Sequence, residues 1–217
     1  MLQRRIPNKY QKHIFNHNFF EVIDTEEKAY WLGFIAADGN IYKTPKNQSL
    51  IRISQRFEDR EIIFKFCQSI NFNLEPRMIK DGTYKIQLTS TKMYNDLLDK
   101  GITPRKSLTL KPPKNVPKDL VRHWIRGYFD GDGSIHIHKK NDMISIIILG
   151  TYEILEFILK NSKISSKIER QKRHNVHKIR KGGQKSLEFL DFIYKDSKIY
   201  LERKYNYYFQ NLYRKVG

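Results

Sequence analysis

The sequence predicts an α+β protein made of two pseudo-twofold-related half-domains, each ordered αββαββα, with a pair of motif helices at their interface. Two observations carry this prediction. Residues 31–39 (WLGFIAADG) and 125–133 (IRGYFDGDG) each place a glycine inside an apolar helical run that ends in Asp-Gly. The helical and strand-like patterns that follow each stretch then come in the same order, about half a chain apart.

In the first half, the motif helix is expected to begin at Asp24, because Asp24 followed by Glu27 resembles a capping box. It is expected to end at Gly39, where a C′ glycine belongs. Residues 40–42 and 49–57 have the patterns of a strand pair, and apolar and polar residues alternate in the second. The remaining elements are a helix over 58–70, strands near 75–80 and 84–89 around an Asp81-Gly82 turn, and a helix over 91–100.

The second half repeats this order. Pro117 is expected at the first position of the second motif helix, which ends at Gly133. The elements that follow are strands over 134–138 and 143–149, a helix over 152–160, strands over 166–173 and 176–181, and helices over 186–194 and 200–212. The copies also align outside the motifs, since 84–87 (YKIQ) matches 177–180 (HKIR) and 105–106 (RK) matches 203–204 (RK).

The chain is therefore expected to divide into four segments. The proline-rich run over 111–117 (KPPKNVP) is the best candidate for a linker between the halves. The predicted segments are an N-terminal extension over 1–23, a first half-domain over 24–110, the linker over 111–117, and a second half-domain over 118–217.

The charge of the chain points to a polyanionic partner. Lysine and arginine outnumber aspartate and glutamate 41 to 23, so the formal net charge is +18. Nucleic acid and an anionic membrane surface both fit this excess. Membrane is the weaker alternative, because no stretch reaches the ~18–20 consecutive apolar residues that a spanning helix needs. Solubility alone would explain a large number of charged residues, but not so large an excess of positive charge.

The single cysteine and the composition of the N-terminus indicate in which cellular compartment the protein is expected. Cys67 is the only cysteine among 217 residues, so an intramolecular disulfide is impossible and a reducing, intracellular compartment (cytoplasm, nucleoid or organelle) is expected. Cys67 lies in an apolar helical run and is predicted to be a core residue rather than a nucleophile. Residues 1–10 are polar and basic, without the apolar region of a signal peptide.

The mid-helix glycines predict that the two motif helices touch. A glycine inside a helix costs about 1 kcal/mol relative to alanine and needs a compensating reason. Residues four apart share a helix face, and each helix presents two small residues at that spacing. Such a stripe lets a second backbone come very close. The interface residues are therefore expected to be Gly33 and Ala37 on one helix and Gly127 and Gly131 on the other.

This packing would bring Asp38 and Asp132 side by side at two helix C-termini. Helix C-termini carry partial negative charge, so two carboxylates there repel each other and the helix dipoles. The arrangement is tolerable if a proton is shared or if cations lie between the acids. Oxygen ligands favour Mg²⁺, and two such ions can activate water and stabilise the leaving oxygen in phosphodiester hydrolysis. The alternative is that Asp-Gly is merely a common turn after a helix.

The two motifs resemble those of LAGLIDADG homing endonucleases, in the monomeric single-chain form that carries two motifs. The first motif departs from the consensus at Trp31 and Ala36, and the second departs at four positions, 126, 128, 129 and 131. Residues 106–112 (KSLTLKP) resemble the interdomain segment of that family, and 200–205 (YLERKY) resemble its C-terminal signature. The resemblance covers roughly residues 24–210 and implies saddle-shaped antiparallel sheets that lie along the DNA major groove.

The resemblance also implies roles for individual residues. Asp38 and Asp132 would bind two or three shared Mg²⁺ ions and position the attacking water, with the backbone carbonyls of Ala37 and Gly131 as further ligands. Asp130 fills the earlier acidic position of the motif but has Ala36 as its counterpart, so it is not expected to be an essential ligand. The residues expected to assist catalysis are Lys106 and Lys204, by polarising water or offsetting phosphate charge, and Gln55, by ordering solvent. The alternative for both lysines is an ordinary surface position. The counterpart of Gln55 in the second half is Gly150.

The alternating strands predict which side chains face DNA. Ile51, Ile53, Ile86 and Leu88 are expected to face helices. The predicted DNA contacts are Arg52, Ser54, Arg56, Lys85, Gln87 and Thr89 in the first half, and His136, His138, Arg170, Lys172, Lys178 and Arg180 in the second. Arginine and lysine suit guanine edges or phosphates, and glutamine suits adenine. Without the family context, a basic strand pair could equally be a solvated face.

His136 and His138 share one strand face, a pattern that fits either a zinc site or DNA contact. A His-x-His pair lacks the further ligands that a closed zinc site needs, and DNA contact is favoured.

The resemblance thus predicts a monomeric, Mg²⁺-dependent endonuclease that makes a double-strand break in a long, asymmetric DNA target, as in intron homing. The alternatives are an RNA maturase that binds its own intron RNA, or a non-cleaving DNA-binding regulator on the same scaffold. An unrelated basic RNA-binding protein would explain the charge but not the paired motifs. An intein origin is not expected, because splice-junction residues are not found at the two ends of the sequence.

Overall fold

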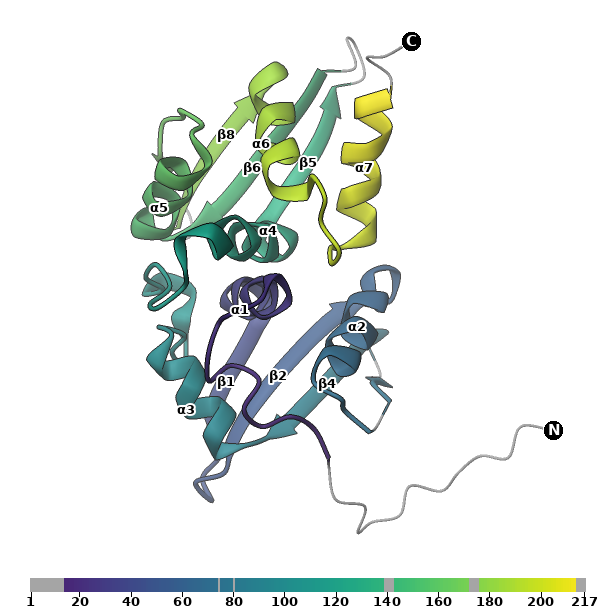
Figure 1. The fold of residues 1–217 in the computed structure, drawn as a ribbon, viewed down its shortest axis with the longest axis vertical. Helices are drawn as coiled ribbons and strands as arrows, with labels where there is room; N and C mark the ends of the chain where they lie inside the picture. Colours follow the sequence, from purple (N-terminus) through teal and green to yellow (C-terminus); the bar gives the residue numbers. More distant parts are fainter. Residues whose placement is uncertain (1–13, 74, 80, 139–142, 172–175, 214–217) are drawn as a thin grey trace, which may run out of the picture.

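The computed structural model describes residues 14–213 except 74, 80, 139–142 and 172–175. Two central helices, α1 (Glu26–Asp38) and α4 (Val121–Asp132), pack against each other along their length. One sheet lies beyond α1 and the other beyond α4, so the helix pair forms the seam between two similar halves (Figure 1).

Each half is built in the predicted order αββαββα. After α1, the first half contains β1 (Gly39–Lys43), β2 (Ser49–Arg56), α2 (Glu61–Ser69), β3 (Arg77–Met78), β4 (Thr83–Thr89) and α3 (Thr91–Asp99). After α4, the second contains β5 (Gly133–His138), β6 (Met143–Gly150), α5 (Tyr152–Ser162), β7 (Glu169–Arg170), β8 (His177–Gly182) and α6 (Gln184–Tyr194), followed by α7 (Glu202–Tyr213). The predicted fold class is therefore confirmed.

The two antiparallel sheets have the same strand order, β1-β2-β4-β3 and β5-β6-β8-β7. Their registers also match. In the first sheet Gly39 pairs with Ile53 and Ile53 with Ile86, and in the second Gly133 pairs with Ile148 and Ile148 with Ile179. The internal alignment of 84–87 with 177–180 follows from this register and is confirmed.

Helices cover one face of each sheet and leave the other open. α2 and α3 pack on β2 and β4 of the first sheet, and α5, α6 and α7 pack on the second. The strand positions that point toward the helices are apolar and buried, including Ile51, Ile53, Ile86 and Leu88, as expected.

Three details at the helix ends differ from the sequence-based expectation. Thr25, not Asp24, caps α1, because its side chain accepts from the Lys28 backbone N–H while Asp24 forms an ion pair with the Lys28 ammonium at 2.8 Å. Gly39 ends α1 as expected but is extended (φ −76°, ψ 154°), so it is not a left-handed C′ glycine. Pro117 precedes a short 3₁₀ turn over Lys118–Leu120, and α4 begins only at Val121.

The edge strands are shorter than predicted. Two residues form β3 and two form β7, where the sequence pattern predicted 75–80 and 166–173. Both are outermost in their sheets, where a strand has one neighbour and needs no long apolar run. The Asp81-Gly82 turn is present, with Gly82 at φ +81° and the Asp81 side chain accepting from the Thr83 N–H.

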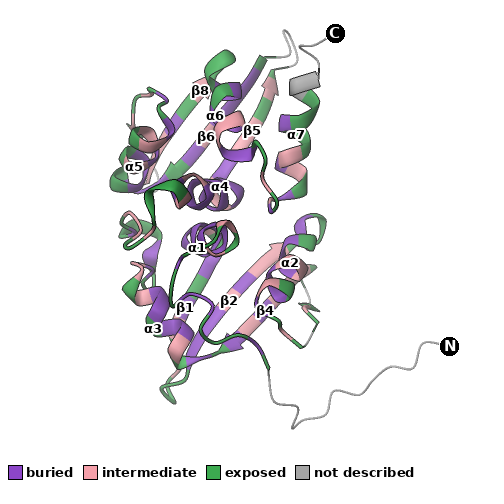
Figure 2. Cartoon of the chain, in the orientation of Figure 1, coloured by how far each residue is buried: buried purple, intermediate pink, exposed green. Residues whose placement is uncertain are grey.

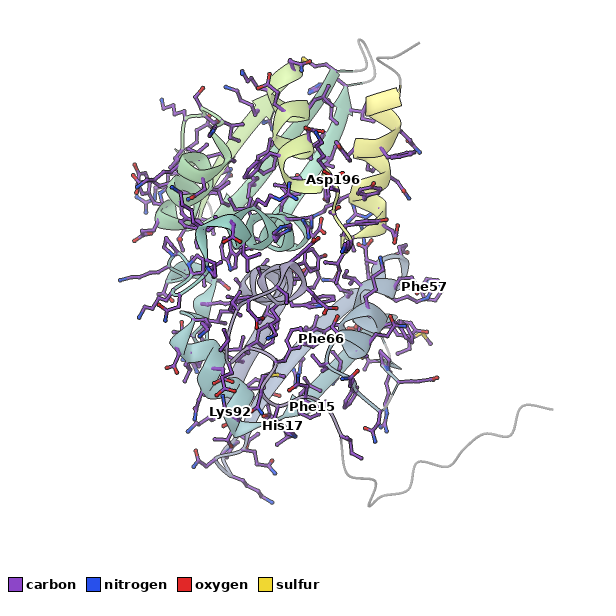
Figure 3. The ribbon with its side chains drawn as sticks, viewed as in Figure 1. Phe15, His17, Phe57, Phe66, Lys92 and Asp196 are labelled. Atoms are coloured by element: carbon purple, nitrogen blue, oxygen red, sulfur yellow. The ribbon has the colours of Figure 1, made fainter. Side chains whose placement is uncertain are left out.

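The core lies around the two motif helices (Figure 2). Every residue of α1 from Ala29 to Ala36 is buried, because sheet and helices of its own half cover one side and α4 covers the other. Trp31 illustrates the first side: its ring meets Phe66 of α2 at 4.9 Å between centroids, and its indole N–H donates to Ser69. Figure 3 shows Phe66 inside the first half.

The segment before α1 closes the outer end of the first half. Phe15 is buried there, with its ring centroid 4.1 Å from that of His17. The His17 Nδ1 lies 2.8 Å from the Ser90 hydroxyl at the start of α3, near Lys92 (Figure 3). Cys67 is buried in α2 with its thiol pKa raised to about 12 by burial, so the predicted core position is confirmed.

Two ion pairs, each with one buried partner, join the two halves. Arg126 of α4 is fully buried and donates to Glu26 of α1 at 2.6 Å, and also to the carbonyls of Ile193 and Ile199. Arg203 of α7 donates two hydrogen bonds to the buried Asp59 of the first half. None of the described helices has the length and apolar composition needed to cross a lipid bilayer.

Candidate active site and nucleic-acid interface

The glycines of the motif helices lie at the point of closest approach, as predicted. A Cβ added at Gly33 would lie 2.0 Å from the Trp124 carbonyl oxygen, and one added at Gly127 would lie 1.9 Å from the Tyr30 carbonyl oxygen. Only a residue without a side chain fits between these backbones. Near the ends of the same helices, a Cβ at Gly131 would meet the Ala37 Cβ at 2.3 Å. α1 and α4 therefore run side by side to a common C-terminal end.

That common end brings Asp38 and Asp132 together. Each is the last residue of its motif helix, and each is followed directly by the first strand of its sheet. A Cβ at Gly131 would lie 3.3 Å from the Asp38 carboxyl carbon, so the first acid reaches the last turn of the opposite helix.

Both carboxyl groups have raised pKa values. Loss of water is the main cause at each, and at Asp132 the nearby Asp38 charge adds to it and raises the pKa to about 6. Part of Asp38 is exposed to solvent, but the surrounding protein atoms still displace enough water to raise its pKa. Two partly desolvated carboxylates at two helix C-termini make a strongly negative site in a basic protein.

Lys106 and Lys204 cap the C-terminal ends of the two motif helices. The Lys106 ammonium donates to the carbonyls of Ala37 and Gly39, at 2.9 and 2.6 Å. The Lys204 ammonium donates to the carbonyls of Phe129, Asp130 and Gly133 within 2.7 Å. Their exposures are 8% and 2%, so neither is an ordinary surface lysine.

Burial lowers the pKa of both ammonium groups, to about 8 for Lys204, while the charges of nearby acids oppose that shift. Each positive charge lies among the carbonyls that a helix end leaves unpaired.

The Gln55 side chain contacts Asp38. It lies near the end of β2 and its amide donates a short hydrogen bond to the Asp38 carboxylate. The strand register makes Gly150 its counterpart, so no side chain from that position reaches Asp132. Asp130, by contrast, is fully enclosed and accepts from the hydroxyls of Tyr30 and Tyr194 and the backbone of Leu201, which is a structural role.

The donor set at the helix ends fits a hard divalent cation. Two carboxylates and neighbouring backbone carbonyls supply only oxygen ligands, as Mg²⁺ and Ca²⁺ prefer. The Ala37 carbonyl is already one acceptor for Lys106, which leaves its second lone pair. Among the described residues, no group of three or more His, Cys, Asp and Glu side chains is placed to hold a metal ion, and none completes a zinc site at His136 and His138.

On the open face of the first sheet the predicted residues lie together. Arg52 pairs with Gln87 and Ser54 with Lys85 across β2 and β4, and Arg56 and Thr89 are exposed near the two ends of this strand pair. Sequence reasoning missed Tyr42, whose hydroxyl and ring both contact the Arg52 guanidinium. Strand alternation could have identified it, because Tyr42 lies two residues after Asn40 on the same strand face, and Asn40 pairs with Arg52.

On the second sheet the agreement is partial. His136, His138, Lys178 and Arg180 lie on the open face, since Ile179 between the last two is buried. Arg170 does not join them: it pairs with His177, which has the same facing as Ile179 and whose ring meets that of Tyr152 at the start of α5. Lys172 lies outside the described residues.

Solved structures of DNA-bound meganucleases share this fold. Meganuclease I-SmaMI bound to uncleaveable DNA has a TM-score of 0.57 at 13% identity, over 82% of this chain and 86% of that chain. The I-LtrWI LAGLIDADG homing endonuclease bound to target DNA has a TM-score of 0.56 at 12% identity, over 93% and 91%. LAGLIDADG meganuclease I-AabMI bound to uncleaved DNA has a TM-score of 0.55 at 13% identity, over 80% and 85%.

The fold of this chain is therefore that of two-domain, single-chain LAGLIDADG meganucleases. Residues 119–208, most of the second half, match the family of LAGLIDADG-like domains. The resemblance inferred from the two motifs is therefore confirmed by an independent sequence match in one half and by the fold of both.

Two curated proteins of Methanocaldococcus jannaschii contain related segments. The replication factor C small subunit is 28% identical over 120 residues, which is 52% of this chain and 6% of that protein. Glutamine–fructose-6-phosphate aminotransferase is 29% identical over 205 residues, which is 88% of this chain and 18% of that protein. The chain spans less than a fifth of either relative's length.

Proposed function

We propose that the protein is a site-specific, Mg²⁺-dependent double-strand DNA endonuclease that acts as a monomer. The observation that carries this proposal is the placement of Asp38 and Asp132 at the common end of α1 and α4, on the pseudo-twofold axis. A symmetric pair of acids suits a reaction that must be performed once on each DNA strand.

The residues have separable roles in this proposal. Asp38 and Asp132, with the carbonyls of Ala37 and Gly131, hold the divalent ions; one of the solved I-SmaMI structures, with a TM-score of 0.51 at 11% identity, contains uncleaved DNA in the presence of calcium ions. Bound Mg²⁺ would supply activation of water and stabilisation of the leaving oxygen. Gln55 fixes the Asp38 carboxylate.

Lys106 and Lys204 hold the helix ends that carry the acids, and their charges offset negative charge at the scissile phosphates.

The open faces of the two sheets bind the DNA major groove. The net charge of +18 and the basic residues of both faces favour a polyanion, and each half-domain, 24–110 and 118–217, reads one half-site. The two faces carry different side chains, so the target is asymmetric. Homing of an intron is the biological process that such an enzyme serves.

The test is selection of cleaved sites from a randomised DNA library with Mg²⁺, followed by carboxylate variants on the selected site. Asp38→Asn and Asp132→Asn are each expected to abolish double-strand cleavage while sparing DNA affinity. Asp99→Asn, an exposed position at the end of α3, is the matched control and should cleave normally. Full activity of either site variant would overturn the metal assignment. Tight, specific binding by the unaltered protein without cleavage would point to a regulator, and preference for structured RNA to a maturase.

A further inference from the structure

We infer that Tyr42, Arg52 and Gln87 form one recognition unit on the open face of the first sheet, and that this unit selects a guanine in the DNA target. The inference rests on the proposed function, which places DNA on this face. It adds the base that the unit reads, and it assigns Tyr42 as the residue that positions the other two.

The three side chains come from three neighbouring strands. Asn40 of β1 pairs with Arg52 of β2, and Arg52 pairs with Gln87 of β4. Tyr42 lies two residues after Asn40 and so has the same facing. Arg52 and Gln87 lie on the two central strands of the sheet. In a sheet that enters the major groove, central strands face base edges, whereas side chains at the rim meet phosphates.

Three hydrogen bonds hold the Arg52 guanidinium. Its Nε and Nη2 both donate to the Gln87 side-chain oxygen, at 3.3 and 2.9 Å, and Nη2 also donates a short hydrogen bond to the Tyr42 hydroxyl. A guanidinium has five N–H donors, so these contacts use three of them. Within the part of the chain that the structure describes, the two N–H groups of Nη1 have no protein acceptor and are available to a ligand.

The contact with Arg52 also fixes the orientation of the Gln87 amide. Arginine cannot accept a hydrogen bond, so the Gln87 atom that faces it must be the oxygen. The Tyr42 hydroxyl donates to the same oxygen at 3.4 Å. The oxygen is therefore occupied by donors, and the Nε2 amino group is the part of Gln87 that remains for a ligand.

This orientation excludes adenine at Gln87, the base that glutamine is expected to suit from the sequence alone. A glutamine that binds adenine donates to N7 and accepts from the N6 amino group with its own oxygen. That oxygen is committed to Arg52. The amino group of adenine would meet only donors and would lose its hydrogen bonds to water without replacement.

Guanine is the base whose major-groove edge matches a surface of donors. It presents two acceptors, N7 and O6, and no donor, whereas adenine and cytosine each present an amino group and thymine offers one acceptor beside a methyl group. The positive charge of Arg52 strengthens a hydrogen bond to either guanine acceptor. Arg52 Nη1 and Gln87 Nε2 are therefore the donors that read guanine in this inference.

Tyr42 makes the unit selective by holding the guanidinium. Its hydroxyl accepts from Nη2, and its ring centroid lies 5.1 Å from the guanidinium carbon. An unrestrained arginine serves a guanine edge or a phosphate equally well. Arg52 would have to break three hydrogen bonds to leave the centre of the sheet for a phosphate at its rim.

The equivalent row of the second sheet has no arginine at its centre. Gly39 pairs with Ile53 as Gly133 pairs with Ile148, so Ile147 corresponds to Arg52. The neighbours of Ile147 across the strands are Ser134 and Arg180. The guanine selected by the Tyr42 unit is therefore expected in one half-site, without a symmetric copy in the other.

The test selects bound sites from a randomised DNA library without Mg²⁺, so that cleavage plays no part. The unaltered protein is compared with Tyr42→Phe, Arg52→Lys and the control Tyr152→Phe, an exposed tyrosine at the start of α5. The guanine whose preference depends on Arg52 is then replaced by adenine, by 7-deazaguanine, which lacks the N7 acceptor, or by inosine, which keeps N7 and O6. Fluorescence anisotropy measures the affinity of the unaltered protein for each DNA.

Adenine at this position is expected to weaken affinity about tenfold or more and 7-deazaguanine about fivefold, while inosine should bind like guanine. Arg52→Lys keeps the charge but cannot form the same fork of hydrogen bonds, so its preference for guanine should fall to about twofold or less. Tyr42→Phe should lower the preference about threefold or more, and Tyr152→Phe should leave it unchanged.

Two outcomes would overturn the inference. Equal affinity for guanine and 7-deazaguanine, or an unchanged preference in Arg52→Lys, would show that Arg52 meets phosphate oxygens instead of a guanine edge. An unchanged preference in Tyr42→Phe would remove the positioning role of Tyr42. The base analogues are measured with the unaltered protein, so they decide the guanine assignment even if a variant does not fold.

Because these are binding measurements, they separate the inference from the proposed function. A protein that binds its selected DNA with this guanine dependence but does not cleave it with Mg²⁺ supports the recognition unit and refutes the nuclease. A protein that cleaves its target without a guanine preference that depends on Arg52 refutes the recognition unit alone.

Discussion

At the scale of single residues, the raised pKa of Asp132 makes the stability of the protein depend on pH. Asp132 is held near Asp38 at a helix C-terminus, where water is partly excluded, and its pKa rises from 3.8 to about 6. The folded protein therefore binds more protons than the unfolded chain between these two values. The contribution of Asp132 to the free energy of unfolding therefore falls as the pH rises from about 4 to about 6, because unfolding then returns the charged carboxylate to water and separates it from Asp38.

Asp132→Asn is therefore expected to stabilise the metal-free protein. An asparagine carries no charge, so at pH 7.5 the variant avoids both the desolvation of a charged carboxylate and its repulsion by Asp38. It should gain about 1–2 kcal/mol, less than the full shift implies because Asp132 is partly solvated. At pH 4 the difference should vanish, since the acid of the unaltered protein is then neutral. Urea unfolding with EDTA at both pH values measures this, and Asp99→Asn should show no such gain. A variant that is no more stable at pH 7.5 would contradict the electrostatic account.

Many residues of the candidate site could be predicted from the sequence because the motif and its surroundings occur twice in the chain. The two acids stand at the ends of the repeated motifs, and Lys106 and Lys204 each follow an arginine in a repeated pair. Gln55 lies in a strand that the alternation of apolar and polar residues predicts. The close approach of the Tyr128 hydroxyl to Gly150 could not be predicted, because it depends on how α4 packs against β6, which the sequence does not show.

At the scale of elements, the helix pair depends on two glycines. Gly33 and Gly127 each face a backbone carbonyl of the opposite helix, which no side-chain movement can clear. The sequence predicted this contact from the cost of a mid-helix glycine. The helix ends were less predictable, since Thr25 and Asp24 are both good caps and only the backbone geometry decides between them.

Gly33→Ala is expected to push the motif helices apart. The added methyl would lie 2.0 Å from the Trp124 carbonyl oxygen, so the seam must open and the free energy of unfolding should fall by about 3 kcal/mol or more. Gly182→Ala is the control, because its Cβ would make only ordinary contacts, the nearest at 3.6 Å from Met143. Thermal unfolding by circular dichroism compares the two. Equal melting temperatures would show that α1 and α4 are not in backbone contact.

The central strands of the two sheets differ on their open faces. β2 presents Arg52, Ser54 and Arg56, whereas β6 presents Ile147 and Leu149, the latter 41% exposed. These β6 side chains were not among the predicted DNA contacts, because apolar residues in a strand read as core. Their facing follows from register, since Ile147 pairs with Arg180 and Leu149 with Lys178.

The second half-domain is therefore expected to read thymine methyl groups. Apolar side chains in the major groove discriminate thymine through its C5 methyl. Replacing thymine by deoxyuridine in the half-site bound by this half should weaken affinity about fourfold per contacted methyl, from about 0.8 kcal/mol for each buried group. Fluorescence anisotropy measures the effect, and Leu149→Ala should reduce it. The same replacement in the other half-site is the control, and an equal loss there would contradict the assignment.

At the scale of the whole molecule, duplication accounts for both the symmetry and its breaking. The sheets, the capped helix ends and the paired acids are shared, and these could be predicted because each copy supports the interpretation of the other. The differences follow from positions where the copies diverge: Gln55 against Gly150, Phe34 against Tyr128, and the polar face of β2 against the apolar face of β6. The proposed DNA-binding role also divides the described lysines into those on the open faces of the sheets, which are expected to contact DNA, and those on the helices of the opposite faces, which are not.

Two lysine variants test whether DNA lies on the open face of the second sheet. Lys178 lies on the open face of the second sheet and forms an ion pair with Glu169 at 3.3 Å, whereas Lys185 lies on α6, which covers the opposite face, and pairs with Glu188 at 2.7 Å. Lys178→Ala and Lys185→Ala each remove one positive charge and one surface ion pair, so general electrostatics change equally. A phosphate contact contributes about 0.9 to the slope of log affinity against log salt. Lys178→Ala should therefore flatten that slope by about one unit and Lys185→Ala should leave it unchanged, and equal slopes for the two variants would mean that DNA does not lie on the open face.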